Sequence, residues 1–285
     1  METIILFCIH GITYSGLLFL IASGLTMVFS MMRVMNFAHA SFYMLAAYIS
    51  YSVLAKTGQF WLCMILSPIV LFAIGSLVER FLIRKVHSHG LVYDLLLTFG
   101  LGFALDEIVK WIWGTMPLDL NLAFATSSIT VLGVTYPVYR LFILAVSILV
   151  LTMLILILFK TNLGIIIRAA VDDSEMANAL GINIPILFNS VFAFGSALAA
   201  LAGVVAAPLF TVSTDLASLV LIDGFVVVVV GGLGSLGGAV LAALIIGQLQ
   251  SFGVLLLPQI SMVFIYVLMA VVLIFKPSGL LGDRK

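Results

Sequence analysis

Long apolar stretches alternate with short polar breaks along most of this 285-residue chain. Each stretch approaches the ~20 residues that an α-helix needs to cross a bilayer. In chain order they cover 4–32, 37–55, 61–83, 91–113, 136–159, 186–210, 217–234, 238–257 and 259–276. The pattern predicts an all-α polytopic membrane protein with about eight to nine transmembrane helices, some of them broken at glycine-rich or polar positions. We expect them to form a single transmembrane domain over residues 1–285.

The composition supports this class, because 64% of the residues are hydrophobic and only 8% are charged. The core of a soluble protein does not bury so large a proportion of apolar residues. The formal net charge is zero, so nothing indicates a nucleic-acid partner. Cys8 and Cys63 lie within apolar stretches and are interpreted as small buried hydrophobes rather than as a disulfide or a metal site.

Lysine and arginine residues divide unevenly between the two sides of the membrane if every stretch crosses it. With the N-terminus outside, the inner side carries Arg33, Arg80, Arg84, Lys85, Lys160, Arg168, Lys276, Arg284 and Lys285, and the outer side carries Lys56, Lys110 and Arg140. The positive-inside rule therefore places segment 160–185 in the cytoplasm. The outer loops are then 56–60, 114–135 and 211–216. The first stretch is long enough to contain an interfacial or broken piece, which leaves the number of crossings open.

The polar segment 160–185 has the signals of a short helix of about two turns on the membrane surface. An acidic or hydroxyl side chain can cap its start, and the candidates are Asp172, Asp173 and Ser174. Gly181 can end the helix in a left-handed conformation, and Pro185 prevents its immediate continuation. A plain loop does not need this organisation, so we expect a helix that docks on a partner.

Asn36 and His39 form a polar break before the second stretch, and their spacing of three puts them on one helix face. Polar groups at membrane depth usually face protein or water. With Ser41 close by, one interpretation is a pathway lining or a hinge. The other is structural, with Asn36 capping the helix and His39 bonded to a neighbouring carbonyl. No second histidine or acid stands at ligand spacing, which argues against a metal site.

The fourth stretch carries Asp106, Glu107 and Lys110, whose spacings of three and four predict a charge cluster at the water boundary. Asp223 lies deeper, in the seventh stretch, and is expected to line a cavity or to pair with a cation. A role for Asp223 in proton relay stays open at this point, without a partner that the sequence identifies.

Small residues recur every fourth position in the sixth stretch, at Gly195, Ala199, Gly203 and Ala207. One helix face is therefore small along its length, which lets another helix approach closely. We expect packing within the chain, and an interface with another subunit is the alternative.

Residues 225–244 match the strand, G-x-G-x-x-G and helix pattern of dinucleotide-binding proteins, with Gly232 and Gly234 as its first glycines. We reject that interpretation, because the pattern needs an acidic residue about 20 positions later. None occurs between Asp223 and Asp283. A glycine-rich break between two membrane helices fits better. The chain also lacks a G-x-x-x-x-G-K-[ST] motif, and no cluster of residues predicts a catalytic site.

Four motifs then occur in order. They are Asn36-Phe-Ala-His39, the loop Thr161…Gly164…Arg168-Ala169…Ala177…Gly181-Ile182-Asn183, the run Gly231–Gly238, and the ending Phe275-Lys-Pro-Ser-Gly-Leu-Leu-Gly282. Together they resemble the LivH-type permease subunits of bacterial branched-chain amino acid ABC importers, over almost the whole chain. Ala40 departs from the family, which usually has glycine after the histidine.

The resemblance implies a multi-pass protein of the bacterial cytoplasmic (inner) membrane that works with other chains. These are a second permease subunit (a LivM-like partner, or a second copy), two cytoplasmic ATPases and an extracytoplasmic solute-binding protein. ATP and Mg would be bound by the ATPases, so this chain would need no cofactor and would not be an enzyme. The solute would be a branched-chain or other hydrophobic amino acid, or a related small solute such as urea or an amide.

The resemblance also implies that segment 160–185 couples the permease to an ATPase. The residues assigned to this role are Arg168, Asp172, Asp173, Glu175, Asn178 and Gly181. The residues assigned to a pathway or hinge are Asn36, His39, Ser41, Asp223, Gly232 and Gly234. The alternative function is a proton-coupled secondary transporter that uses Asp223, Asp106 or His39. It predicts uptake without an ATPase and gives no reason for an organised cytoplasmic helix.

Overall fold

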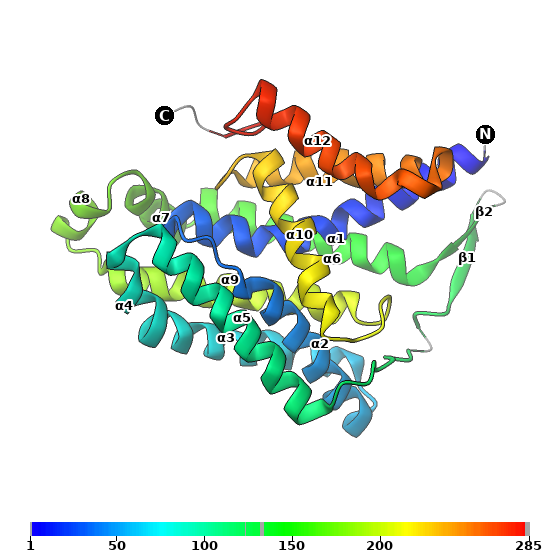
Figure 1. The fold of residues 1–285 in the computed structure, drawn as a ribbon, viewed down its shortest axis with the longest axis horizontal. Helices are drawn as coiled ribbons and strands as arrows, with labels where there is room; N and C mark the ends of the chain where they lie inside the picture. The colour runs from blue at the N-terminus through cyan, green and yellow to red at the C-terminus, as the bar shows by residue number, and fades with distance from the viewer. Residues whose placement is uncertain (1, 123, 132–133, 283–285) are drawn as a thin grey trace.

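The computed structural model describes residues 2–122, 124–131 and 134–282, and almost all of its regular structure is helical (Figure 1). The longer helices are α1 (Glu2–Met32), α2 (Ala38–Thr57), α3 (Phe60–Val78), α5 (Leu91–Trp113), α6 (Val138–Lys160), α9 (Ile184–Ala206), α10 (Asp215–Gly231), α11 (Leu236–Leu256) and α12 (Ser261–Phe275). Shorter helices are α4 (Arg84–Val86), α7 (Asn162–Asp172) and α8 (Ser174–Ala179), and a π-helix covers Glu79–Ile83. The prediction of an all-α polytopic membrane protein is confirmed.

Within the described part of the chain, six helical segments are long and apolar enough to cross a membrane. They are Thr3–Met32, Phe60–His89, Val138–Lys160, Ile184–Ala206, Leu236–Leu256 and Pro258–Phe275. The first is continuous, without the break that the sequence left open. α10 has only 17 residues, and α5 carries several charged side chains. The predicted total of eight to nine crossings is therefore approximate.

A β-hairpin begins in segment 114–135, which was predicted as a loop, and ends at Pro137. β1 (Ser128–Val131) pairs antiparallel with β2 (Val134–Pro137), and Ser128 lies opposite Pro137. Earlier in the same segment, the backbone of Leu118 exchanges hydrogen bonds of 2.9 and 2.8 Å with that of Val212. Two predicted outer loops therefore meet at one end of the molecule, as the predicted topology requires.

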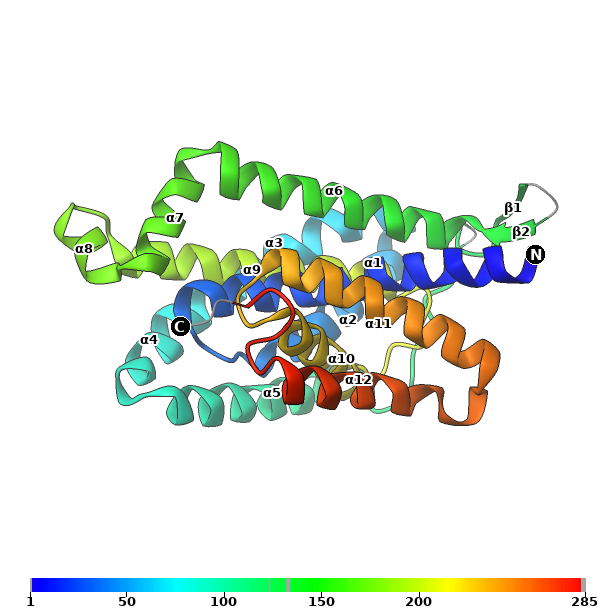
Figure 2. The ribbon, with the colours of Figure 1, turned by 90° about the horizontal axis from the view of Figure 1, so that it is seen from above.

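The molecule has two distinct ends (Figure 2). We call the end with the N-terminus, β1 and β2 the hairpin end, and the end with α4, α7 and α8 the basic end. Helices that begin or end at the basic end bring Arg33, Arg84, Lys85, Lys160 and Arg168 there. Lys56, Lys110 and Arg140 lie in the terminal turns of helices at the hairpin end.

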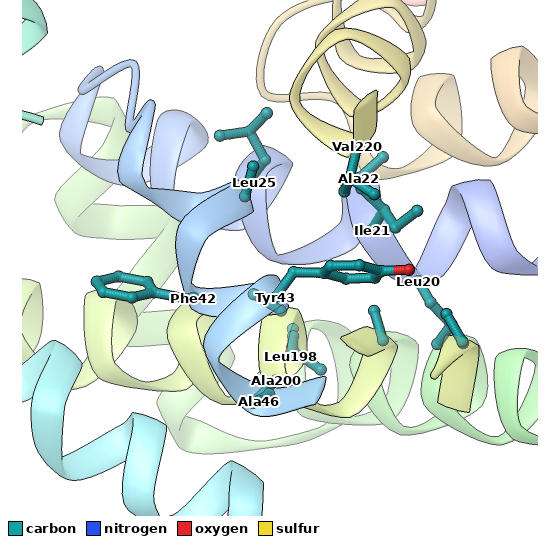
Figure 3. Close-up of a cluster of buried hydrophobic side chains, with 14 of the residues drawn as sticks. Leu20, Ile21, Ala22, Leu25, Phe42, Tyr43, Ala46, Leu198, Ala200 and Val220 are labelled. Carbon is teal, nitrogen blue, oxygen red and sulfur yellow. The ribbon is translucent and has the colours of Figure 1, made fainter. Parts of the chain in front are cut away.

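The core lies where α9 packs against α1, α2 and α3. The small-residue stripe of α9 makes this possible and is buried within the chain, as predicted. A side chain at Gly203 would collide with the carbonyl of Tyr43 in α2, and one at Gly195 would reach the carbonyl of Gly24 in α1. Figure 3 shows the Tyr43 ring among aliphatic side chains of α1, α9 and α10, which include Ile21, Leu198 and Val220.

The glycine-rich break joins α10 to α11. Gly232 and Gly234 have φ values of 107° and 84°, a left-handed region that favours glycine. Residues 225–231 are helical, which agrees with rejecting a nucleotide-binding strand there. The chain end returns to this break, because Leu280 N–H donates to the Val230 carbonyl at 2.8 Å.

Candidate functional site

α7 and α8 project from the basic end, away from the long helices (Figures 1 and 2). α7 begins at Thr161, whose Oγ1 accepts a hydrogen bond of 3.2 Å from the Gly164 N–H. Its buried side chains, such as Ala170, lie on one face, and polar residues occupy the other. The short helix predicted for segment 160–185 begins near residue 172, so α7 was not predicted. A hydroxyl cap followed by an amphipathic pattern was the available signal.

The short helix predicted after residue 172 is α8. Of the three candidate caps, Asp173 is the one used, and its Oδ1 accepts a hydrogen bond of 2.9 Å from Met176 N–H. Gly181 ends the turn with φ of 90°, and Ile182 N–H closes it on the Ala177 carbonyl at 3.1 Å. The predicted acidic cap and the predicted left-handed glycine are both confirmed. Pro185 lies in the first turn of α9.

All six residues predicted to contact an ATPase are exposed on this projecting segment. They are Arg168, Asp172, Asp173, Glu175, Asn178 and Gly181. The guanidinium of Arg168 also donates to the Leu158 carbonyl at the end of α6. Large apolar side chains lie exposed beside these polar groups, among them Leu180 at 77% and Met176 at 58%. The segment therefore presents a mixed surface of apolar and charged groups.

A cavity of about 410 Å³ opens at the basic end, between the projecting segment and the long helices. Its lining includes Arg33 after α1, Asp172 at the end of α7, and Gly234 in the glycine-rich break. Arg33 has a φ of 53°, unusual for a residue with a side chain. The cavity brings one predicted coupling residue and one predicted pathway residue to the same space.

Asn36, His39 and Ser41 are all buried near the start of α2. His39 Nε2 lies 3.2 Å from the Ile21 carbonyl, which is the contact that the structural interpretation of His39 expects. The proposed Asn36 cap is wrong, because α2 starts after Phe37 without a side-chain cap. Asn36 instead lines a narrow cavity with Phe37 and Phe225, and its Oδ1 has no hydrogen-bond partner among the described residues.

The acidic residues have separate partners. Asp223 accepts a hydrogen bond of 3.4 Å from the Tyr14 hydroxyl, so the expectation that it pairs with a cation is not met among the described side chains. Lys110 pairs with Glu107 at 2.7 Å, whereas Asp106 accepts from Ser41 at 3.3 Å. α2 packs against α5, and this contact supplies Asp106 with a partner that spacing along one helix did not reveal.

A buried carboxylate that contacts two other side chains was not predicted. Glu79, at the basic end of α3, is 1% exposed and contacts both Arg84 and Asn189. The signal was present in the sequence, because Glu79 and Asn189 interrupt apolar stretches, where polar residues are costly and often functional.

Comparison with known proteins agrees with this architecture. Residues 7–273 match the family described as branched-chain amino acid transport system, permease component. The chain is 31% identical to the high-affinity branched-chain amino acid transport system permease protein BraD of Pseudomonas aeruginosa, over 96% of this chain and 94% of the relative. It is 27% identical to LivH of Salmonella typhimurium, again over 96% and 94%.

An archaeal relative, the probable branched-chain amino acid transport permease protein LivH of Methanocaldococcus jannaschii, is 30% identical over 95% of this chain and 90% of its own length. No solved structure matches the chain. The match extends through the long helices and the projecting segment between them. The chain is therefore a multi-pass membrane protein that belongs to the permease-component family of branched-chain amino acid transport systems.

Proposed function

We propose that this chain is the transmembrane permease subunit of an ATP-binding cassette importer. It moves branched-chain or other hydrophobic amino acids into the cytoplasm, and ATP and Mg are bound by separate ATPase subunits. The observation that carries this proposal is the projecting segment α7–α8, because its shape and surface suit a docking element.

The caps of α7 and α8 stabilise the segment locally, so its shape does not require a bound partner. Its exposed apolar side chains lie outside the segments that cross the membrane. Apolar groups that gather on a water-facing surface commonly mark a protein contact. The adjacent charges of Arg168, Asp172 and Glu175 would orient the partner.

The cationic residues support an orientation with the basic end in the cytoplasm. The ATPases would then dock beneath α7 and α8, and the hairpin end would receive solute from an extracytoplasmic binding protein. This orientation suits a bacterial inner membrane. The unpaired amide oxygen of Asn36, beside the narrow cavity, supports a pathway or hinge role for the group Asn36, His39, Ser41, Asp223, Gly232 and Gly234.

Three of the relatives are named for branched-chain amino acid transport, which favours that solute class over urea or an amide. Solute would cross beside a second permease subunit, either a LivM-like chain or another copy of this one. The exposed apolar faces of the long helices, on α3 and α12 among others, are available to lipid or to that partner.

The alternative, proton-coupled transport, needs titratable groups that exchange protons along one path. Asp106, Asp223 and His39 instead contact Ser41, Tyr14 and the Ile21 carbonyl, respectively. These separate contacts favour the ATP-driven function.

The test is uptake of leucine by vesicles that contain this chain, its partner permease, the two ATPases and the binding protein. We expect uptake to require ATP and to be indifferent to a proton gradient. Leu180→Asp should weaken ATPase docking about tenfold, because it places a charge in an apolar contact. Ile129→Asp, an exposed apolar position in the hairpin, is the matched control. Uptake driven by a proton gradient without ATP would contradict the proposal.

A further inference from the structure

An ion pair between a buried carboxylate and a partly exposed arginine lies at the basic end of α3. The Glu79 carboxylate begins the π-helix Glu79–Ile83 and is almost inaccessible to solvent. Arg84 binds it with two nitrogens, through Nε at 3.0 Å and Nη2 at 2.6 Å. This two-pronged geometry is the strongest form of carboxylate recognition by arginine.

Asn189 of α9 binds the same carboxylate. Its Nδ2 donates to Glu79 Oε2 at 2.7 Å and to the Ser76 carbonyl at 2.8 Å. Its Oδ1 accepts from the Ser76 hydroxyl at 2.7 Å. The amide of Asn189 therefore ties α9 to α3 by three hydrogen bonds, all close to the start of α9.

Arg84 also reaches the first turn of α9, just after the projecting helices. Its Nη2 donates to the Pro185 carbonyl at 2.7 Å, at the point where segment 160–185 ends. The guanidinium therefore links the buried carboxylate after α3 to the backbone of α9, at the point where the chain enters α9 from the projecting helices. We call the group formed by Ser76, Glu79, Arg84, Asn189 and the Pro185 carbonyl the Glu79 clamp.

We propose that the Glu79 clamp transmits movement of α7 and α8 to the membrane helices α3 and α9, with Glu79 and Arg84 as positioning residues for transport. The inference rests on the proposed docking of an ATPase on α7 and α8. A buried carboxylate that loses one partner is strongly destabilised, so the clamp resists partial opening and moves as a unit. Its π-helix is a local irregularity of the kind found at functional positions in helices.

Stability alone does not explain an ion pair on a buried carboxylate. Replacing both partners with apolar residues of similar volume is often neutral or stabilising. The double variant Glu79→Met/Arg84→Met removes the link to Pro185 while it leaves Asn189 bonded to Ser76. It therefore separates transmission of movement from support of the fold.

The experiment compares wild-type and double-variant complexes reconstituted with the ATPases, the partner permease and the binding protein. The readouts are thermal unfolding, ATP hydrolysis, and leucine transported per ATP hydrolysed. We expect unchanged unfolding and retained hydrolysis, with leucine transported per ATP lower by about tenfold. Arg84→Lys keeps the positive charge but loses the planar guanidinium that binds the carboxylate with two nitrogens. It should therefore give an intermediate value of leucine transported per ATP. Lys85→Met, at the exposed neighbouring position, should match wild type.

A double variant with the wild-type ratio of transport to hydrolysis would overturn the proposal and leave the clamp a structural feature. A double variant that no longer folds would also overturn it, because stability would then explain the ion pair. The wild-type complex separates this inference from the proposed function. Without ATP-driven uptake by wild type, the proposed function itself fails.

Discussion

α9 and the projecting segment α7–α8 are neighbours in the chain, yet they are stabilised in opposite ways. α9 is held by three other helices, and its small residues lie against their backbones. α7 and α8 contact α1, α6 and α9 only over short stretches, and each begins at a capping side chain, Thr161 or Asp173. Local capping leaves a helix surface free for a partner, whereas close packing uses that surface within the fold.

The largest effect should follow from filling the α9 stripe. Gly203→Leu drives a side chain into the Tyr43 carbonyl, and overpacking of this kind costs about 1–3 kcal/mol or more. Thermal unfolding of the purified protein in detergent should shift to a clearly lower temperature. Gly100→Leu, on α5 where a Cβ meets nothing within 4 Å, is the control and should unfold like wild type. If both variants unfolded at the same temperature, close packing would not distinguish α9 from the projecting segment.

Breaking α8 should spare the fold and remove the coupled function. Ala177→Pro deletes the N–H that bonds to the Asp173 carbonyl at 3.0 Å, and proline inside a helix costs about 3 kcal/mol. We expect an inserted, folded protein whose ATP-driven leucine uptake is lost. Ala177→Ser keeps the N–H and should retain uptake. Normal uptake by the proline variant would show that α8 is not needed for coupling.

The smallest effect should come from removing a single cap. Asp173→Ala should cost about 1 kcal/mol, confined to α8, because one side-chain acceptor is lost. Amide hydrogen exchange over residues 174–179 should accelerate about fivefold, while exchange in α9 stays unchanged. Asp172→Ala, at the neighbouring acid that does not cap α8, should leave exchange in α8 as in wild type. Faster exchange spreading into α9 would mean that the two elements are not stabilised separately.

The confirmed predictions concern features that a few neighbouring residues decide. The cap at Asp173 and the left-handed Gly181 follow from hydrogen bonds within about two turns of chain. α7 was not predicted, because only one short helix was expected in segment 160–185. The signals for α7 were the capping residue Thr161 and the amphipathic pattern that follows it. The hairpin of β1 and β2 was not predicted either, because the prediction rested on long apolar stretches and not on short strands.

The contacts that the sequence did not predict join side chains on different helices. Asp106 has Lys110 at a favourable spacing but bonds to Ser41, 65 positions away in the chain. Glu79 and Asn189 are 110 positions apart and meet because α3 packs along α9. Spacing along one helix says which residues share a face, and it does not say what that face meets.

The sequence by itself determined that this chain is a multi-pass, helical membrane protein with a capped polar segment between two apolar stretches. Apolar length, charge distribution and helix caps are properties of contiguous residues, so they are visible without a fold. Only the tertiary structure decided which polar groups pair at depth and which glycines lie against a backbone. These contacts depend on how closely the helices approach one another, and that distance is set by packing between residues far apart in the chain.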